Sequence, residues 1–402
     1  MNLNRHHPLI ESSPAVVPRK THVSIHSEDR NVLKYPSSSQ FVIDLPSDMN
    51  NVSDVGLAAW SFPSNYSTFS ELNNNITLTF TVDNAYTPPN YNPQNTDLQT
   101  RICTALTAKS ADPSSANIYF QIESGFYSPE VMSVELTNKF NKAVSEVIAT
   151  YFSANGWTES IEEFYGVGGY TEFIVVYHTV SQNIWFGNKS SSFTITNSTQ
   201  IIMDSTIRCS NKHVLADFSA WGLPPFLGLS HDNVSSETYA YDATAPKSTI
   251  RFLPRFYHGD VVYPGDNGYW LRPNSALAGA TAHWLKAPYK INLMGPSDLY
   301  LEINELNHID ETSPFNVSTF TATTNQTNSR VGASFAKLPV PSTPVSQWFD
   351  KLVPYVKTFS PPLNRMRKIS VKVRYHNGQL VNFGLFNYTF VLEFTTQHPT
   401  RN

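Results

Sequence analysis

The sequence is short of charged residues, which make up 15% of its 402 positions, whereas an ordinary soluble domain carries roughly 25%. Aromatic residues account for 13% of the chain. A weakly charged, aromatic-rich chain has more surface to bury than solubility alone requires. Two explanations fit this composition equally well: contact with neighbouring molecules, or a thick β-sheet core rich in Tyr and Phe.

Cysteine is also scarce, since Cys103 and Cys209 are the only two. Two cysteines build neither a disulfide framework nor a zinc-binding pattern, so we expect a reducing compartment. No run approaches the roughly 18 apolar residues of a membrane span, and contact with a membrane is not indicated. The stretch from Met1 to Lys20 lacks the apolar core of a signal peptide, so we expect an intracellular product outside the secretory route.

Motifs of catalysis and metal binding are missing as well. His258 and Asp260 are the nearest thing to an acid–base pair, but no third partner is evident, and a turn is the favoured interpretation. His308 lies close to Asp310 and Glu311 without the ligand spacing of a calcium loop. We therefore predict no catalytic residue, no metal site, no cofactor and no enzymatic activity. The net charge of −4 argues against nucleic-acid binding.

Alternating apolar residues predict many short strands. Phe41, Ile43 and Leu45 indicate one strand that is ended by Pro46, and Val55 to Phe62 indicates the next. Many such strands with long loops between them are typical of an antiparallel β-sandwich.

One amphipathic helix is predicted over about 128–152. Ser128 is a good N-cap, Pro129 suits the first helical position, and Glu130 suits the positive end of the helix dipole. Five apolar residues then recur on one face: Met132, Leu136, Phe140, Ala143 and Val147. We interpret this face as core packing rather than a cofactor site.

The clearest strand pattern lies near the C-terminus. Four apolar residues alternate there with polar ones: Ile369, Val371, Val373 and Tyr375. Asn377 and Gly378 follow, and Asn-Gly favours a hairpin turn because both of its central residues need positive φ. A second alternating strand covers 388–394. We predict that the two strands form a hairpin that closes the sandwich.

The other face of the first hairpin strand is basic. Five basic residues lie on it or just before it: Arg365, Arg367, Lys368, Lys372 and Arg374. We take these residues as the candidate interface, which would meet a negatively charged protein surface. The alternative is a solvent-facing surface whose lysines prevent stray strand pairing, and nucleic acid is the least favoured partner.

Several short sequence segments, taken in their order along the chain, resemble segments of a known protein family. The opening, Val23–Arg30 with Tyr35-Pro36 and Phe41–Pro46, is similar to its S-x-D-R, Y-P and F-x-(I/V)-x-L-P elements. Gly125–Glu130 is similar to its G-x-Y-s-p-e-e-L segment, and Leu301–Asn307 to a late strand. Phe359–Leu363, Ile369–Val373 and Asn377-Gly378 resemble its C-terminal signature. The family is that of the minor capsid and penton-like proteins of nucleocytoplasmic large DNA viruses, especially the chlorovirus kind.

The resemblance implies an all-β jelly-roll capsid component without catalytic activity. We expect an extended N-terminal arm over 1–22 and a jelly-roll domain over 23–402, with a large insertion around 155–285 where no phrase matches. The expected function is that of a minor capsid protein that bridges or cements major capsid capsomers or fills a vertex. The expected partners are the major capsid protein, other minor capsid proteins and other copies of the chain, in a virion assembled in the host cytoplasm.

Two other functions remain open at this stage. One is a carbohydrate- or receptor-binding β-sandwich on the virion surface, for which Tyr269, Trp270 and Trp284 would supply exposed loop aromatics. The other is a glycan-acting enzyme, which needs two carboxylates about 5–10 Å apart across a cleft. The sequence nominates no such pair.

Overall fold

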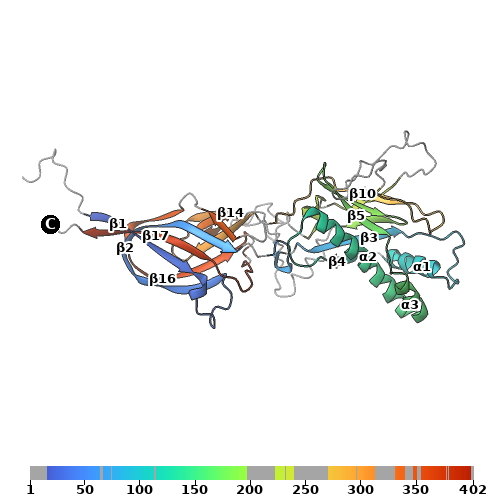
Figure 1. The fold of residues 1–402 in the computed structure, drawn as a ribbon, viewed down its shortest axis with the longest axis horizontal. Helices are drawn as coiled ribbons and strands as arrows, with labels where there is room; N and C mark the ends of the chain where they lie inside the picture. Colours follow the sequence, from blue (N-terminus) through green and yellow to red (C-terminus); the bar gives the residue numbers. More distant parts are fainter. Residues whose placement is uncertain are drawn as a thin grey trace, which may run out of the picture. The chain divides into compact units, whose positions relative to one another are not determined.

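The computed structural model describes residues 16–63, 67–73, 75–112, 115–196, 222–230, 232–239, 270–295, 297–312, 331–339, 347–350, 355–376, 378 and 380–399. The chain separates into two compact units (Figure 1). Unit 1 consists of the described residues within Met1–Ser67, Pro296–Asn316 and Phe320–Asn402, and unit 2 of those within Thr68–Gly295. Along the chain, unit 2 is therefore inserted between two parts of unit 1.

These boundaries differ from the expected ones. The insertion expected around 155–285 is larger, because unit 2 begins at Thr68 and takes in the predicted helix and several predicted strands. The arm expected over 1–22 overlaps strand β1, which begins at Val16. Residues 1–15 lie outside the described residues.

Unit 1 is built on an antiparallel sheet of seven strands. Their order is β1-β17-β2-β16-β11-β14, and β15 also pairs with β2. The bounds are Val16–His26 (β1), Gln40–Pro63 (β2), Asp298–Ile303 (β11), Ala336–Pro339 (β14), Gln347–Asp350 (β15), Val356–Arg374 (β16) and Thr389–Pro399 (β17). A separate pair is formed by Ile309–Thr312 (β12) and Val331–Ser334 (β13).

One apolar core holds unit 1 together. It takes inward-facing residues from strands at both ends of the chain, among them Val23, Phe41, Trp60, Val371 and Phe390. The alternation predicted for β16 and β17 is confirmed, because its apolar members within the strands are buried: Ile369, Val371 and Val373 of β16, and Phe390, Leu392 and Phe394 of β17. Burial of this kind stabilises a sheet by about 25 cal/mol for each Å² of apolar surface removed from water.

The predicted C-terminal hairpin is wrong. β16 pairs with β2 and β11, and β17 pairs with β1 and β2, so β2 lies between the two strands that were expected to pair. The turn itself is present: the N–H of Gly378, which has φ of 86°, donates to Tyr375 at 3.0 Å. Asn377 lies outside the described residues. Among the described residues, the turn is followed by one isolated bridge, Arg374 to Leu380, and the chain then continues to β17, on the other side of β2.

The predicted break at Pro46 is also wrong, because β2 is one strand of 24 residues. Its pairing with β16 passes from Asp44 opposite Lys368 directly to Met49 opposite Met366, with a register shift between them. Pro46 falls within this irregularity. A proline is tolerated at a bulge, where its missing N–H is not needed for the ladder.

Unit 2 contains two antiparallel sheets of four strands each. One has the order β5-β6-β10-β9 and the other β4-β3-β7-β8. The bounds are Phe173–His178 (β5), Asn183–Asn188 (β6), His283–Lys286 (β10), Glu237–Thr238 (β9), Ile118–Gln121 (β4), Thr77–Asn84 (β3), Ser192–Thr196 (β7) and Val234–Ser235 (β8). Both sheets contribute to one apolar core, and β4 is the end strand of its sheet.

The predicted helix is present as α2 (Pro129–Ala154), and the side chain of Ser128 accepts a hydrogen bond from the N–H of Val131. Its core face packs against the sheets, with Phe140 in contact with Phe120 and Phe173. Two further helices are additional to the prediction: α1 (Leu98–Ala111) and α3 (Thr158–Gly166). Asp97 caps α1 by accepting from the N–H of Thr100 at 2.9 Å.

The fold is all-β in class, with antiparallel sheets and few helices, as predicted, and it is consistent with the predicted jelly-roll β-sandwich. Over the ranges that the structure describes, no helix is both long and apolar enough to cross a membrane.

Candidate functional site

Arg374 is not part of an exposed basic face. Its side chain is more than nine-tenths buried and donates to Glu302 and Glu311. Burial alone lowers the pKa of this guanidinium, but the hydrogen bonds to Glu311 and Glu302 outweigh burial, so the pKa of Arg374 lies above its ordinary value. The guanidinium also lies 5.2 Å from the ring centre of Tyr300. The inclusion of Arg374 in the candidate interface was therefore wrong, because β11 and β12 bring carboxylates over this part of β16.

The other four basic residues remain accessible along β16. Arg365 lies 2.5 Å from Asp48, and Lys368 lies 3.4 Å from Asp44, both across the pairing with β2. Arg367 is exposed and Lys372 is half-buried. Exposed ion pairs of this kind contribute only about 0–1 kcal/mol to stability. Arg365, Arg367, Lys368 and Lys372 are called the basic strip below.

The opening motif forms a clamp at one end of unit 1. The guanidinium of Arg30 donates to the carbonyls of Ser27 (2.6 Å), Tyr35 (2.9 Å) and Pro36 (3.0 Å). It also donates to the side chain of Asn387 at 2.7 Å. The S-x-D-R and Y-P elements are thus joined by one arginine, which fixes the loop after β1 against the loop before β17.

Large apolar side chains are exposed on these two clamped loops. Leu33 is 100% exposed and Leu385 is 96% exposed, and Val32 and Phe386 are also more than half exposed. The hydroxyl of Ser38 donates to the carbonyl of Phe386 at 2.9 Å, so the loops are neighbours. These four residues are called the apolar loop patch. No pattern in the sequence predicted them, because a loop has no periodicity to mark its exposed residues.

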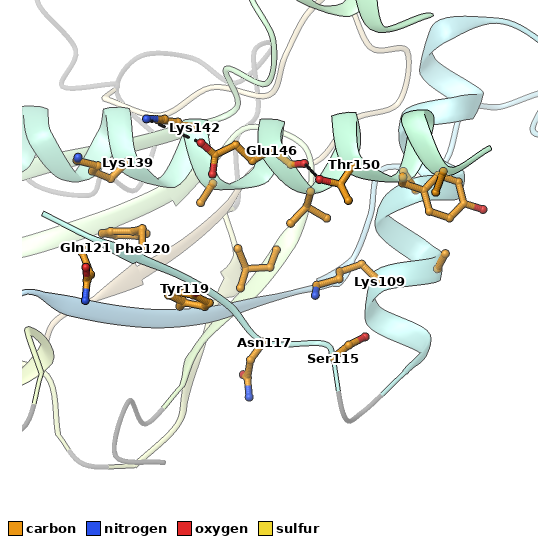
Figure 2. Close-up of a pocket in the computed structure, with 17 residues that line it drawn as sticks. Lys109, Ser115, Asn117, Tyr119, Phe120, Gln121, Lys139, Lys142, Glu146 and Thr150 are labelled. Atoms are coloured by element: carbon orange, nitrogen blue, oxygen red, sulfur yellow. Dashed lines mark hydrogen bonds and ion pairs between the residues drawn. The ribbon is translucent and has the colours of Figure 1, made fainter. Parts of the chain in front are cut away.

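A groove in unit 2 runs between β4, α1 and α2, with a volume of about 760 Å³ (Figure 2). The part of α2 that lines it is a single face at helical spacing: Lys139, Lys142, Ala143, Glu146, Val147, Thr150, Tyr151 and Ala154. Ala105, Ala108 and Lys109 of α1 close one end. Small residues on both helices leave the space between the helices and the strand.

The second wall of the groove is the segment Ser115–Gln121, which ends in β4. β3 pairs with β4 on one side, and no strand in the described part of the chain pairs with it on the other. Ile118 and Phe120 point into the core, whereas Tyr119 is 60% exposed. The groove therefore offers an unpaired strand edge beside a helix.

A smaller cavity of about 130 Å³ lies elsewhere in unit 2. Glu172 lines it and is only 8% exposed. Its Oε1 accepts from the side chain of Asn274 at 2.7 Å, while Oε2 has no hydrogen-bond partner among the described residues. Burial raises the pKa of the Glu172 carboxyl, although the bond from Asn274 and the charge of Lys189 act against this rise.

Some of the residues considered for catalysis or metal binding lie within the described part of the chain. Glu311, which is close to His308 in the sequence, forms an ion pair with Arg374, and its carboxylate therefore has a structural role. His258 and Asp260 lie outside the described residues. No group of three or more His, Cys, Asp or Glu residues that could hold a metal ion occurs in the described ranges. Cys103 is a buried free thiol, and Cys209 lies outside the described residues.

Trp270 and Trp284, two of the three aromatic residues considered for glycan binding, are not exposed platforms. Trp270 is only 6% exposed and packs edge-on against Trp185. Trp284 also contacts Trp185, with ring centres 5.2 Å apart. Tyr269 lies outside the described residues. Because these tryptophans fill a small core of their own, the reason for expecting a carbohydrate site at them is lost.

No family model matches the chain, and no curated protein matches it either. Solved structures that are similar to it include the following two. A chain from the 3.5 Å cryo-EM structure of the Sputnik virophage is 11% identical with a TM-score of 0.39, and the match covers 96% of this chain and 98% of that one. The mavirus penton protein is 7% identical with a TM-score of 0.33, covering 94% and 99%. Similarity at this level leaves function to be argued from this chain's own residues.

Proposed function

We propose that this protein is a structural component of an icosahedral virus capsid. In this role it is a minor capsid protein that bridges or cements major capsid capsomers, or fills a vertex, through protein–protein contacts. The apolar loop patch is the observation that carries the proposal. Folded chains rarely leave several large apolar side chains exposed together unless another molecule covers them.

The geometry of the clamp supports a contact role for this patch. Arg30 and Ser38 hold the two loops together from within unit 1, so the exposed side chains of Leu33 and Leu385 are presented on anchored loops. Full burial of one such side chain contributes about 1.5–3 kcal/mol. The sequence segments that resemble minor capsid and penton-like proteins include Arg30 and Tyr35-Pro36, which are residues of this clamp. The opening motif therefore serves to anchor the loops that carry the apolar loop patch.

The basic strip is proposed as a second contact. Its four members lie along β16, and their partners Asp44 and Asp48 are themselves exposed. A negatively charged surface of the major capsid protein or of another minor capsid protein could therefore compete for these cations. Such contacts set orientation and association rate more than affinity.

Particle incorporation tests the proposal. We expect the chain in purified particles, and we expect the double variant Leu33→Asp/Leu385→Asp to fold normally but to be depleted from them, measured by quantitative mass spectrometry. Val180→Asp is the matched control, because Val180 is 74% exposed and lies in unit 2. Absence of the unaltered chain from particles would refute the proposed function. Normal incorporation of the double variant would refute the role of the patch.

A further inference from the structure

We propose that the groove between β4 and α2 binds an extended acidic peptide segment of another protein, which adds to the sheet as a strand beside β4. This inference goes beyond the proposed capsid role and does not depend on it. It rests on the unpaired strand edge, the shape of the groove and the charges that line it.

The strand edge supplies the backbone bonding. β4 is paired only by β3 in the described chain. Residues from both faces of the strand, the buried Ile118 and Phe120 and the exposed Tyr119 and Gln121, line the groove, and we infer from this that the free edge of β4 borders it. An unpaired edge next to a hollow is the arrangement that accepts a peptide by strand addition, in which main-chain hydrogen bonds supply affinity. β4 has four residues, which corresponds to about 13 Å of extended chain.

The helix face supplies apolar contacts for alternate side chains of such a peptide. Ala143 is buried, and Val147 and Tyr151 are partly buried against the core, yet all three line the groove. Ala108 and Ala154 add small exposed side chains at one end. The lining is thus apolar along its floor, as is usual for a peptide or ligand site.

Charge determines the kind of peptide. Four side chains that are charged at neutral pH line the groove, and three of them are lysines: Lys109, Lys139 and Lys142, with Glu146 as the fourth. Lys109 reaches from α1 toward the strand (Figure 2). The ion pairs of Lys139 with Glu135 (3.5 Å) and of Lys142 with Glu146 (3.8 Å) are long i,i+4 pairs, worth about 0.3–0.5 kcal/mol. The lysines therefore favour carboxylates and repel a basic strand.

The test uses the full chain and a fluorescein-labelled peptide, acetyl-Glu-Val-Glu-Val-Glu-Val-amide, measured by fluorescence anisotropy. We expect saturable binding, and no binding of the corresponding Lys-Val peptide. Lys109→Glu should weaken binding by about tenfold, which is about 1.4 kcal/mol. Lys290→Glu is the matched control, because Lys290 is an exposed lysine of unit 2 outside the groove.

Two further measurements separate strand addition from simple charge attraction. Ala108→Phe should block the groove and abolish binding while the circular dichroism spectrum stays unchanged, because Ala108 is exposed. Two versions of the Glu-Val peptide are N-methylated at alternate residues, one at the Glu positions and the other at the Val positions. Each version lacks the main-chain N–H donors along one edge of the extended peptide, so one of the two should fail to bind.

Four results of the peptide-binding assays would each overturn the inference. They are the absence of saturable binding, equal binding of the Lys-Val peptide, unchanged binding of both N-methylated peptides, and unchanged binding to Ala108→Phe. Self-association of the chain that Ala108→Phe abolishes, without binding of the Glu-Val peptide, would identify a second copy as the occupant and would also overturn it.

Discussion

The guanidinium of Arg374 donates a hydrogen bond to the carboxylate of Glu311, and both side chains are more than nine-tenths buried in unit 1. A second bond from Arg374 reaches Glu302. These contacts join β16 to β11 and β12, which are more than sixty residues earlier in the chain. A buried charge network of this kind ties the position of β12 to that of the main sheet.

Removal of the arginine should therefore destabilise unit 1. Arg374→Met leaves two carboxylates without their cation, and we expect a loss of about 3–5 kcal/mol in the free energy of unfolding. Arg365→Met is the matched control, because its pair with Asp48 is exposed and should cost about 0–1 kcal/mol. Urea denaturation followed by circular dichroism measures both. Equal losses for the two variants would contradict the structural role of Arg374.

Two deletions at the N-terminus should distinguish the role of the arm in particle incorporation from the role of β1 in stability. Deletion of residues 1–15 leaves every described residue of β1 in place, so we expect an unchanged thermal unfolding midpoint and weaker incorporation into particles. Deletion of residues 1–22 also removes Val16 to His22 from β1 together with the ion pair of Lys20 and Glu393 at 2.7 Å. We expect this longer deletion to lower the midpoint by several degrees. Normal incorporation of the shorter deletion would refute a contact by the arm.

Glu172 should make the stability of unit 2 depend on pH. Burial raises the pKa of this carboxyl above its ordinary value of 4.5, so its stabilising effect is complete below the unfolded-state pKa and is lost as the pH rises through the folded-state pKa. At neutral pH the ionised group is therefore a penalty. We expect Glu172→Gln to raise the unfolding midpoint at neutral pH, because its amide oxygen can still accept from Asn274.

The advantage of Glu172→Gln should shrink as the solution is made acidic, because the native carboxyl then becomes protonated. Thermal unfolding between about pH 4 and pH 8 tests this linkage. Glu159→Gln, at an exposed position of α3, is the control for losing one negative charge. An advantage of the same size at every pH would show that burial of the charge is not the cause.

Gly187 should not tolerate a side chain. A Cβ at this position in β6 would lie 2.9 Å from Leu271 and from ring carbons of Trp270. We expect Gly187→Ala to cost about 1–3 kcal/mol through overpacking and to change the fluorescence of the tryptophan cluster. Gly125→Ala is the control, because a Cβ there meets nothing within 4 Å. If Gly187→Ala is as stable as Gly125→Ala, Trp270 and Leu271 do not pack tightly against Gly187.

Local patterns predicted local structure well. The cap at Ser128 and the apolar face of the helix were visible in the sequence because both depend on residues within a few turns of each other. The period-two burial of β16 and β17 was visible for the same reason. α1 was missed although Asp97 signals its start, because its apolar face is weak and the Pro- and Asn-rich residues before it indicate a loop.

Long-range pairing was not predictable in the same way. The alternation of Val371 or Phe390 is the same whichever strand lies alongside, so it could not reveal that β2 separates β16 from β17. The Asn-Gly turn biases its own backbone angles only. Pro46 failed as a stop signal because the bulge that accommodates it depends on the register of β2 against β16.

The sequence by itself determined the helix that begins after Ser128, the strands with a clear period of two, the apolar faces of both, and the β class of the fold. These properties follow from spacing along the chain. Only the tertiary structure decided that Arg374 is buried against Glu311, that the loops carrying the exposed Leu33 and Leu385 are held together, and that β4 leaves an edge beside α2 unpaired among the described strands. Each of these depends on contacts between segments far apart in sequence, and short-range periodicity carries no information about such contacts.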